Sequence, residues 1–127
     1  MNNTKVLIVD DEKDYLILMQ ERLASWGYEI AIATGGKEAL NVIREKNPDI
    51  VILDYFMPDM DGTAVLREIR KFDMNLAVIM LTAHADIKNI KGAQGLGVSA
   101  FIPKISDCSD VMVSLRAALD LAQKKSD

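Results

Sequence analysis

Residues 50–54 read Ile-Val-Ile-Leu-Asp, a run of four apolar residues that ends directly in an acidic one. Continuous apolar runs of this length are typical of parallel strands that are buried on both faces. Three further runs also end in polar side chains: VLIV at 6–9 before Asp10 and Asp11, VIML at 78–81 before Thr82, and AFIP at 100–103 before Lys104. Because ligands of parallel sheets bind at the carboxyl ends of the strands, we expect these side chains to meet at one edge.

The three predicted neighbours Asp10, Asp11 and Asp54 repel one another. Like charges about 4 Å apart cost about 4 kcal/mol at an effective dielectric of about 20, so a cation is needed among them. Carboxylate oxygens are typical ligands of a hard divalent ion. With Lys104 as a second positive charge, this edge is suited to receive a phosphoryl group.

The fold class follows from the alternation of strand and helix patterns. Apolar runs of strand length alternate with helical patterns, which predicts an α/β domain with a five-stranded parallel sheet and five helices. Glu29 and Pro103 mark two of the strands as edges, and right-handed crossovers then favour the flavodoxin-like, doubly wound order 2-1-3-4-5. The predicted strands are 5–9, 29–33, 49–54, 76–81 and 100–103, and the helices are about 12–26, 36–46, 62–71, 86–97 and 107–123, with fraying expected after 123. Helix 12–26 is expected to end at Gly27 and to pack against the core through an apolar stripe at three- and four-residue spacing: Tyr15, Leu16, Met19, Leu23 and Trp26.

Composition excludes several other classes of protein. The chain has 127 residues, of which 50% are hydrophobic, and a net charge of -4 without a basic stripe. We therefore expect one core and no direct binding to nucleic acid. No signal peptide and no apolar run of about 18 residues is present, so we expect a cytoplasmic protein without a membrane segment. Cys108 is the only cysteine, which excludes an internal disulfide.

Four stretches together resemble the receiver domain of two-component response regulators, and the resemblance covers nearly the whole chain. They are VLIVDDE at 6–12, LDYFMPDMDG at 53–62, LTAHAD at 81–86 and GVSAFIPK at 97–104. Each motif alone is weak, but their order and their placement after strands make a chance match improbable. The resemblance implies a single receiver domain over residues 1–127 with no output domain.

The resemblance also assigns roles to individual residues. Asp54 is the phosphoacceptor, and Lys104 pairs with the phosphoryl group. Thr82 provides the switch hydroxyl and Phe101 the switch aromatic ring. The expected metal is Mg²⁺, for which Mn²⁺ can substitute, and its ligands are Asp10, Asp11, Asp54 and the backbone carbonyl of Phe56.

The implied function is a signalling switch without enzymatic action on a separate substrate. It accepts a phosphoryl group from a sensor histidine kinase or a histidine phosphotransfer protein, and it catalyses only its own phosphorylation and dephosphorylation. A carboxylate can act as the nucleophile once the charges of donor and acceptor are neutralised. The downstream protein target is expected on the face formed by helix 86–97, strand 100–103 and helix 107–123.

Alternative interpretations of these residues remain open. A degenerate or constitutive receiver would act only as a protein-binding module, although all five polar site residues are present. A phosphohydrolase of the haloacid-dehalogenase type would need a second Asp two residues after the nucleophile, where this chain has Phe56. Asp11 alone could equally cap the following helix, and Asp59 and Asp61 suit a turn.

Three departures from the family pattern fall on the expected output face. Ile105 follows Lys104 where relatives often have proline, which excludes a cis X-Pro bond there. Gly92 and Gly95 each cost about 1 kcal/mol in a helix relative to alanine, so helix 86–97 is predicted to be short or mobile. Phe101 lacks the hydroxyl of a tyrosine. His84, two residues after Thr82, either is an exposed loop residue or limits access of water to the acyl phosphate.

Overall fold

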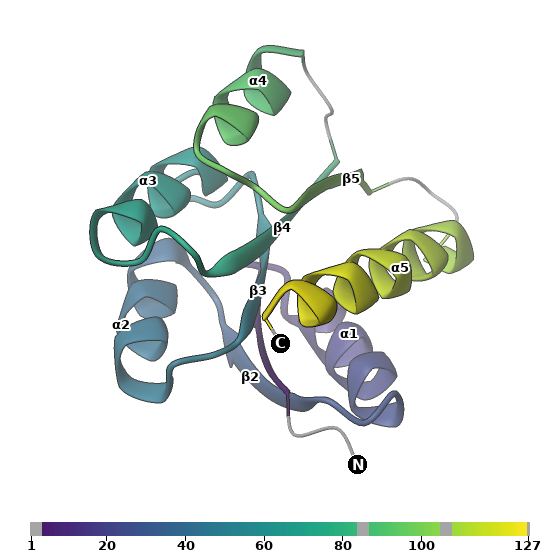
Figure 1. Ribbon diagram of the computed structural model, residues 1–127. Helices are drawn as coiled ribbons and strands as arrows, with labels where there is room; N and C mark the ends of the chain where they lie inside the picture. The colour runs from purple at the N-terminus through teal and green to yellow at the C-terminus, as the bar shows by residue number, and fades with distance from the viewer. Residues whose placement is uncertain (1–3, 84–86, 105–107, 127) are drawn as a thin grey trace.

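Strands and helices alternate along the residues that the computed structural model describes, 4–83, 87–104 and 108–126 (Figure 1). The elements are β1 (Lys5–Val9), α1 (Lys13–Ser25), β2 (Glu29–Ala33), α2 (Gly36–Lys46), β3 (Ile50–Asp54), α3 (Gly62–Phe72), β4 (Ala77–Thr82), α4 (Ile87–Gly95), β5 (Ala100–Pro103) and α5 (Cys108–Ser126). The predicted elements are all present, and only α5 differs by more than two residues at an end.

The five strands form one parallel sheet in the order β2-β1-β3-β4-β5, which confirms the predicted class and topology. The central strand β3 is buried at all five residues, as its unbroken apolar run indicates. The edge strands β2 and β5 carry the exposed residues Glu29 and Pro103. The winding reverses between β1 and β3, and the carboxyl ends of these two strands are therefore where a ligand is expected.

Helices cover both faces of the sheet, with α1 and α5 on one side and α2, α3 and α4 on the other (Figure 1). Alternate residues of each strand point to opposite faces, so Ile8 joins the α1–α5 core and Leu7 joins the core of the other face. The apolar stripe predicted on α1 is confirmed. Its members Leu16, Met19 and Leu23 are buried, with Tyr15 and Trp26 packed at the border of the same core.

The helix ends show one confirmed and one wrong expectation. Gly27 follows α1 with a φ of 95°, which glycine adopts at little cost. The chain was expected to fray after residue 123, but α5 continues to Ser126. The two lysines at 124 and 125 are good helix formers and no glycine or proline precedes them, so nothing local ends the helix earlier.

Of the expectations for the α4–β5–α5 side, one can be compared with the structure and two fall outside the described residues. The helix α4 is short, nine residues, as its glycines predict. His84 and the bond between Lys104 and Ile105 involve residues outside the described ranges. Within those ranges, no helix is both long and apolar enough to cross a membrane.

Candidate metal and phosphoryl site

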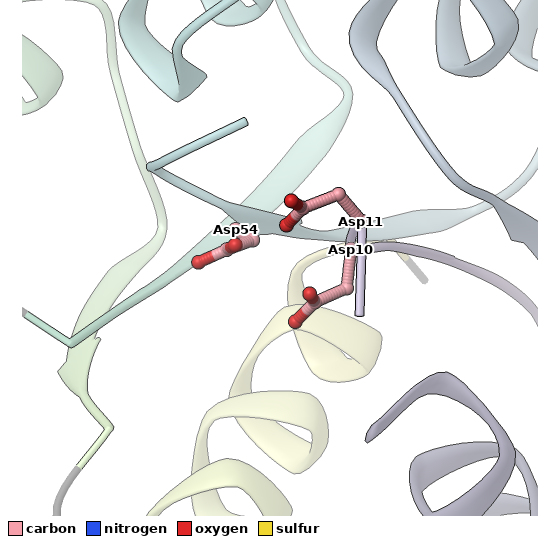
Figure 2. A group of neighbouring side chains, drawn as sticks. All are labelled: Asp10, Asp11 and Asp54. Carbon is pink, nitrogen blue, oxygen red and sulfur yellow. The ribbon is translucent and has the colours of Figure 1, made fainter. Parts of the chain in front are cut away.

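Three aspartates from two neighbouring strands meet at the carboxyl edge of the sheet. Val9 lies beside Leu53 in the β1–β3 register, which brings the following residues, Asp10 and Asp54, next to each other. One carboxylate oxygen from each of Asp10, Asp11 and Asp54 lies within 4.8 Å of the other two. Figure 2 shows the three carboxyl groups converging from the ends of β1 and β3. The predicted cluster is therefore present.

Lys104 reaches the same cluster from the end of β5. Its Nζ lies 2.6 Å from Oδ2 of Asp10 and 3.3 Å from Oδ1 of Asp54. The other oxygen of Asp10 accepts a hydrogen bond of 3.0 Å from the backbone N–H of Glu12. Asp10 is 1% exposed and Asp54 6%, whereas Asp11 is exposed at the rim. The site is thus an acidic cluster at the carboxyl edge of the sheet, with a lysine on one side.

Burial controls the protonation of this cluster. Burial raises the pKa of Asp54 from 3.8 to about 6; the charge of Lys104 opposes this shift, and the neighbouring charge of Asp10 adds to it. Burial alone would lower the pKa of Lys104, but its hydrogen bond to Asp10 and the charge of Asp54 raise that pKa. One ammonium group does not balance three carboxylates, so negative charge remains for another cation.

The donor set fits a small, hard divalent ion. Among the residues that the structure describes, the candidate ligands in this cluster are all carboxylate oxygens, and Mg²⁺ typically binds through one or two carboxylates while keeping several waters. The exposed position of Asp11 leaves space for such waters. The carbonyl of Phe56 as a further ligand stays a prediction.

Thr82 and Phe101 lie on the two strands that follow β3. Thr82 is the last residue of β4 and is fully buried, and its carbonyl accepts a hydrogen bond from the backbone N–H of Lys104. In register, Leu81 lies beside Asp54 and Phe101 beside Met80. Phe101 is half-buried against the core under α2, α3 and α4. All the side chains predicted from strand ends thus lie on neighbouring strands of the same sheet.

Sequence comparison identifies the family. A profile of the response regulator receiver domain matches residues 6–116. The chain belongs to the response regulator receiver domain family. It is a receiver domain of the kind found in two-component signalling, as its four motifs predict.

Relatives and solved structures agree with this assignment. Sporulation initiation phosphotransferase F of Bacillus subtilis (strain 168) is 33% identical over 95% of this chain and 98% of that protein. The crystal structure of a CheY-like receiver domain from Methanospirillum hungatei JF-1 superposes with a TM-score of 0.86 at 29% identity, covering 98% of this chain and 99% of the other. The structure of TrrA from Thermotoga maritima in complex with Mg(2+)-BeF gives a TM-score of 0.79 at 31% identity, covering 91% and 98%. The receiver spans about half or less of the length of the transcriptional regulators that it also matches.

The loop after Asp54 is held in place by a close backbone contact at Gly62. The N–H of Gly62 donates a hydrogen bond of 2.6 Å to the carbonyl of Tyr55. A Cβ on Gly62 would lie 2.6 Å from Sδ of Met80 and 2.9 Å from Cα of Tyr55. Only glycine allows this approach, which folds the start of α3 back against β3 and Asp54.

Asp59 has a supporting role that sequence analysis missed. It was interpreted as a turn residue, but its carboxylate accepts hydrogen bonds of 3.1 Å from the N–H groups of both Gly36 and Lys37 at the start of α2. These hydrogen bonds, that of Lys37 most, lower the pKa of Asp59. The signal was present in the sequence, because Gly35 at the N-cap of α2 offers no side chain to cap the helix.

Proposed function

We propose that this receiver is a phosphorylation-controlled switch. It accepts a phosphoryl group on Asp54 from the phosphohistidine of a sensor kinase or a histidine phosphotransfer protein, and it then changes its affinity for a protein partner. The observation that carries this proposal is the buried Asp54 carboxylate, which lies beside Lys104 and the pair Asp10–Asp11 at the carboxyl edge of the sheet.

The chemistry needs a nucleophile and charge neutralisation. An oxygen of Asp54 attacks the phosphorus atom, the new O–P bond forms as the P–N bond to the donor histidine breaks, and the leaving nitrogen keeps the electron pair. Mg²⁺, held by Asp10, Asp11, Asp54 and the carbonyl of Phe56, supplies positive charge at the phosphoryl oxygens when bound. Lys104 supplies the second charge, and as a compact point charge it can follow the phosphoryl group onto Asp54.

The switch is proposed to use the two strands beyond β3. The hydroxyl of Thr82, at the end of the neighbouring strand, donates a hydrogen bond to a phosphoryl oxygen on Asp54 and draws the following loop inward. Phe101 then moves into the space that this loop vacates. Phosphorylation shifts the population between the two states only by as much as it favours one of them.

The proposed target surface is the α4–β5–α5 face. Val113 and Leu121 on α5 are 71% and 63% exposed, so this helix offers apolar side chains to a protein partner. The receiver catalyses only its own phosphorylation and dephosphorylation in this scheme. It acts on no separate substrate.

Intact mass spectrometry tests the proposal. The protein is incubated with a small phosphodonor and Mg²⁺, with parallel samples containing EDTA or the variant Asp54→Asn. The expected result is one phosphoryl adduct that needs both Mg²⁺ and Asp54. Asp49→Asn, just before β3 at the opposite end of the sheet, is a matched control that keeps the adduct. No adduct from the small donor or from a phosphohistidine protein would favour a constitutive binding module instead.

A further inference from the structure

Lys104 has a third neighbour besides the two aspartates. Its Nζ lies 4.2 Å from the centroid of the Tyr15 ring, a distance at which a cation is attracted to the face of an aromatic ring. The ammonium group is therefore enclosed by Asp10, Asp54 and this ring, and the lysine side chain is only 13% exposed. Sequence analysis interpreted Tyr15 as one member of the apolar stripe of α1.

The position of Tyr15 differs from that of the core residues on the same helix. Tyr15 is in the first turn of α1, four residues after Asp11, and it is half-buried at the border of the core. Its neighbour Leu16 is fully buried and fills the core itself. An aliphatic side chain at position 15 would cover the same border but would offer no negatively polarised face to an ammonium ion.

We infer that Tyr15 is a positioning residue for Lys104, an inference that rests on the proposed function. Lysine has a flexible four-carbon chain, and holding its head in one place costs rotamer entropy. The Tyr15 ring restricts Nζ to a position from which it can leave Asp10 and meet the phosphoryl group on Asp54. Part of the rotamer entropy that Lys104 must lose is therefore already lost before the phosphodonor binds.

Substitution of the ring gives an expected kinetic result. Tyr15→Leu lowers the maximal rate of phosphorylation by a small phosphodonor about 3- to 30-fold, the range that corresponds to a cation–π contact. Tyr15→Phe keeps the aromatic face and retains a rate within about twofold of the wild type. The Mg²⁺ dissociation constant is expected to stay nearly the same in both variants, because the carboxylates are unchanged.

A second aromatic–cation pair, between α1 and Arg116 on α5, provides the matched control. Trp26 at the C-terminal end of α1 lies with its ring 5.0 Å from Cζ of Arg116, far along the helix from the site. Trp26→Leu removes a comparable ring and is expected to change stability without changing the phosphorylation rate. Thermal unfolding of each variant shows which remain folded.

A double-mutant comparison tests whether Tyr15 acts through Lys104. In a Lys104→Met background, Tyr15→Leu is expected to cause no further loss of rate. The same fold-loss in both backgrounds would overturn the inference, because Tyr15 would then act through general packing. An unchanged rate for Tyr15→Leu in the Lys104 background would overturn it as well, while leaving the proposed function intact.

Proton NMR gives a readout that needs no phosphorylation. The ring current of Tyr15 is expected to shift the side-chain methylene protons of Lys104 upfield, and the shift is kept in Tyr15→Phe and lost in Tyr15→Leu. Lys104→Met identifies these signals by their disappearance. Unshifted signals in the wild type would overturn the inference even if the wild type accepted no phosphoryl group, an outcome that would count separately against the proposed function.

Discussion

The helices α3 and α4 cover the same face of the sheet but are built very differently. In α3, Asp61 caps the first turn through Ala64, and three apolar side chains, Val65, Leu66 and Ile69, are fully buried. In α4, Ala93 is the only fully buried side chain among those described at residues 90–95. The helix that follows Asp54 in sequence is thus firmly packed, whereas the described part of α4 fully buries a single side chain.

The C-terminal end of α4 is attached to α3 through Arg70. The guanidinium of Arg70 on α3 donates hydrogen bonds of 2.7 Å to the carbonyl of Leu96 and 3.0 Å to that of Gly97. It also donates to the carbonyls of Asp73, at the end of α3, and Leu76, just before β4. One side chain therefore fixes the end of α4 to α3, so a rearrangement after Thr82 would move the beginning of α4 more than its end. This difference agrees with the proposed switch, in which the site around Asp54 stays fixed and α4 moves.

The largest expected effect is at the firmly packed helix. Gly62→Ala places a methyl group against the backbone of Tyr55, and we expect it to lower the free energy of unfolding by about 3 kcal/mol. Chemical denaturation measures the loss. A loss below about 0.5 kcal/mol, the level of an ordinary surface substitution, would mean that the loop after Asp54 is not held as tightly as proposed.

The second-largest expected effect is on the pH dependence of stability, and it comes from the buried carboxylate of Asp54. The pKa of Asp54 is raised to about 6 in the folded state, above its unfolded value of 3.8. The stability that protonated Asp54 contributes is fully present below about pH 4 and is lost as the pH rises through about 6. Without metal, Asp54→Asn is therefore expected to be more stable than the wild type by about 2 kcal/mol at pH 7, and by little at pH 4.

Thermal and denaturant unfolding in EDTA at the two pH values measures this difference. Added Mg²⁺ is expected to stabilise the wild type more than the variant, since the ion binds the folded state and relieves the repulsion. A variant that gains the same stability at both pH values would contradict the raised pKa of Asp54.

The attachment of α4 gives the third effect. Arg70→Met leaves four carbonyl groups without their charged donor, and we expect a loss of about 1–2 kcal/mol because the exposed carbonyls regain water. Faster amide exchange should be confined to the end of α4 and to the two connections that Arg70 holds, between α3 and β4 and between α4 and β5. Lys71→Met, at the next position of the same helix, is an exposed control that should leave the stability and the amide exchange unchanged.

The smallest expected effect is a gain in stability from a substitution at Gly95. No described atom lies within 4 Å of a Cβ placed on Gly95, so alanine fits there without a clash. Gly95→Ala is expected to raise stability by about 0.5–1 kcal/mol through its higher helix propensity. Chemical denaturation of Gly95→Ala in parallel with Gly62→Ala compares the two helices directly. A destabilising effect would show that α4 is packed more closely than the structure indicates.

The sequence predicted what depends on local pattern. Strand ends such as Asp54 and Thr82 were placed correctly because apolar runs define the strands and the parallel topology then brings their ends together. The contacts of Asp59, Arg70 and Tyr15 were not predicted. These contacts join segments that are distant in sequence. Each of the three side chains also suits a simpler local role in a turn, on the surface or in the core, so nothing in the local sequence pattern indicates the contact.

Hydrogen exchange of backbone amides, resolved by NMR, tests most directly the claim that α3 is fixed and α4 responds. In the unphosphorylated receiver, residues 91–95 of α4 are expected to exchange at least about tenfold faster than residues 66–72 of α3, a difference of about 1.4 kcal/mol in local opening. After addition of a phosphodonor and Mg²⁺, exchange should slow in α4 and stay unchanged in α3. Equal protection of the two helices before phosphorylation, or a change confined to α3 afterwards, would contradict the claim.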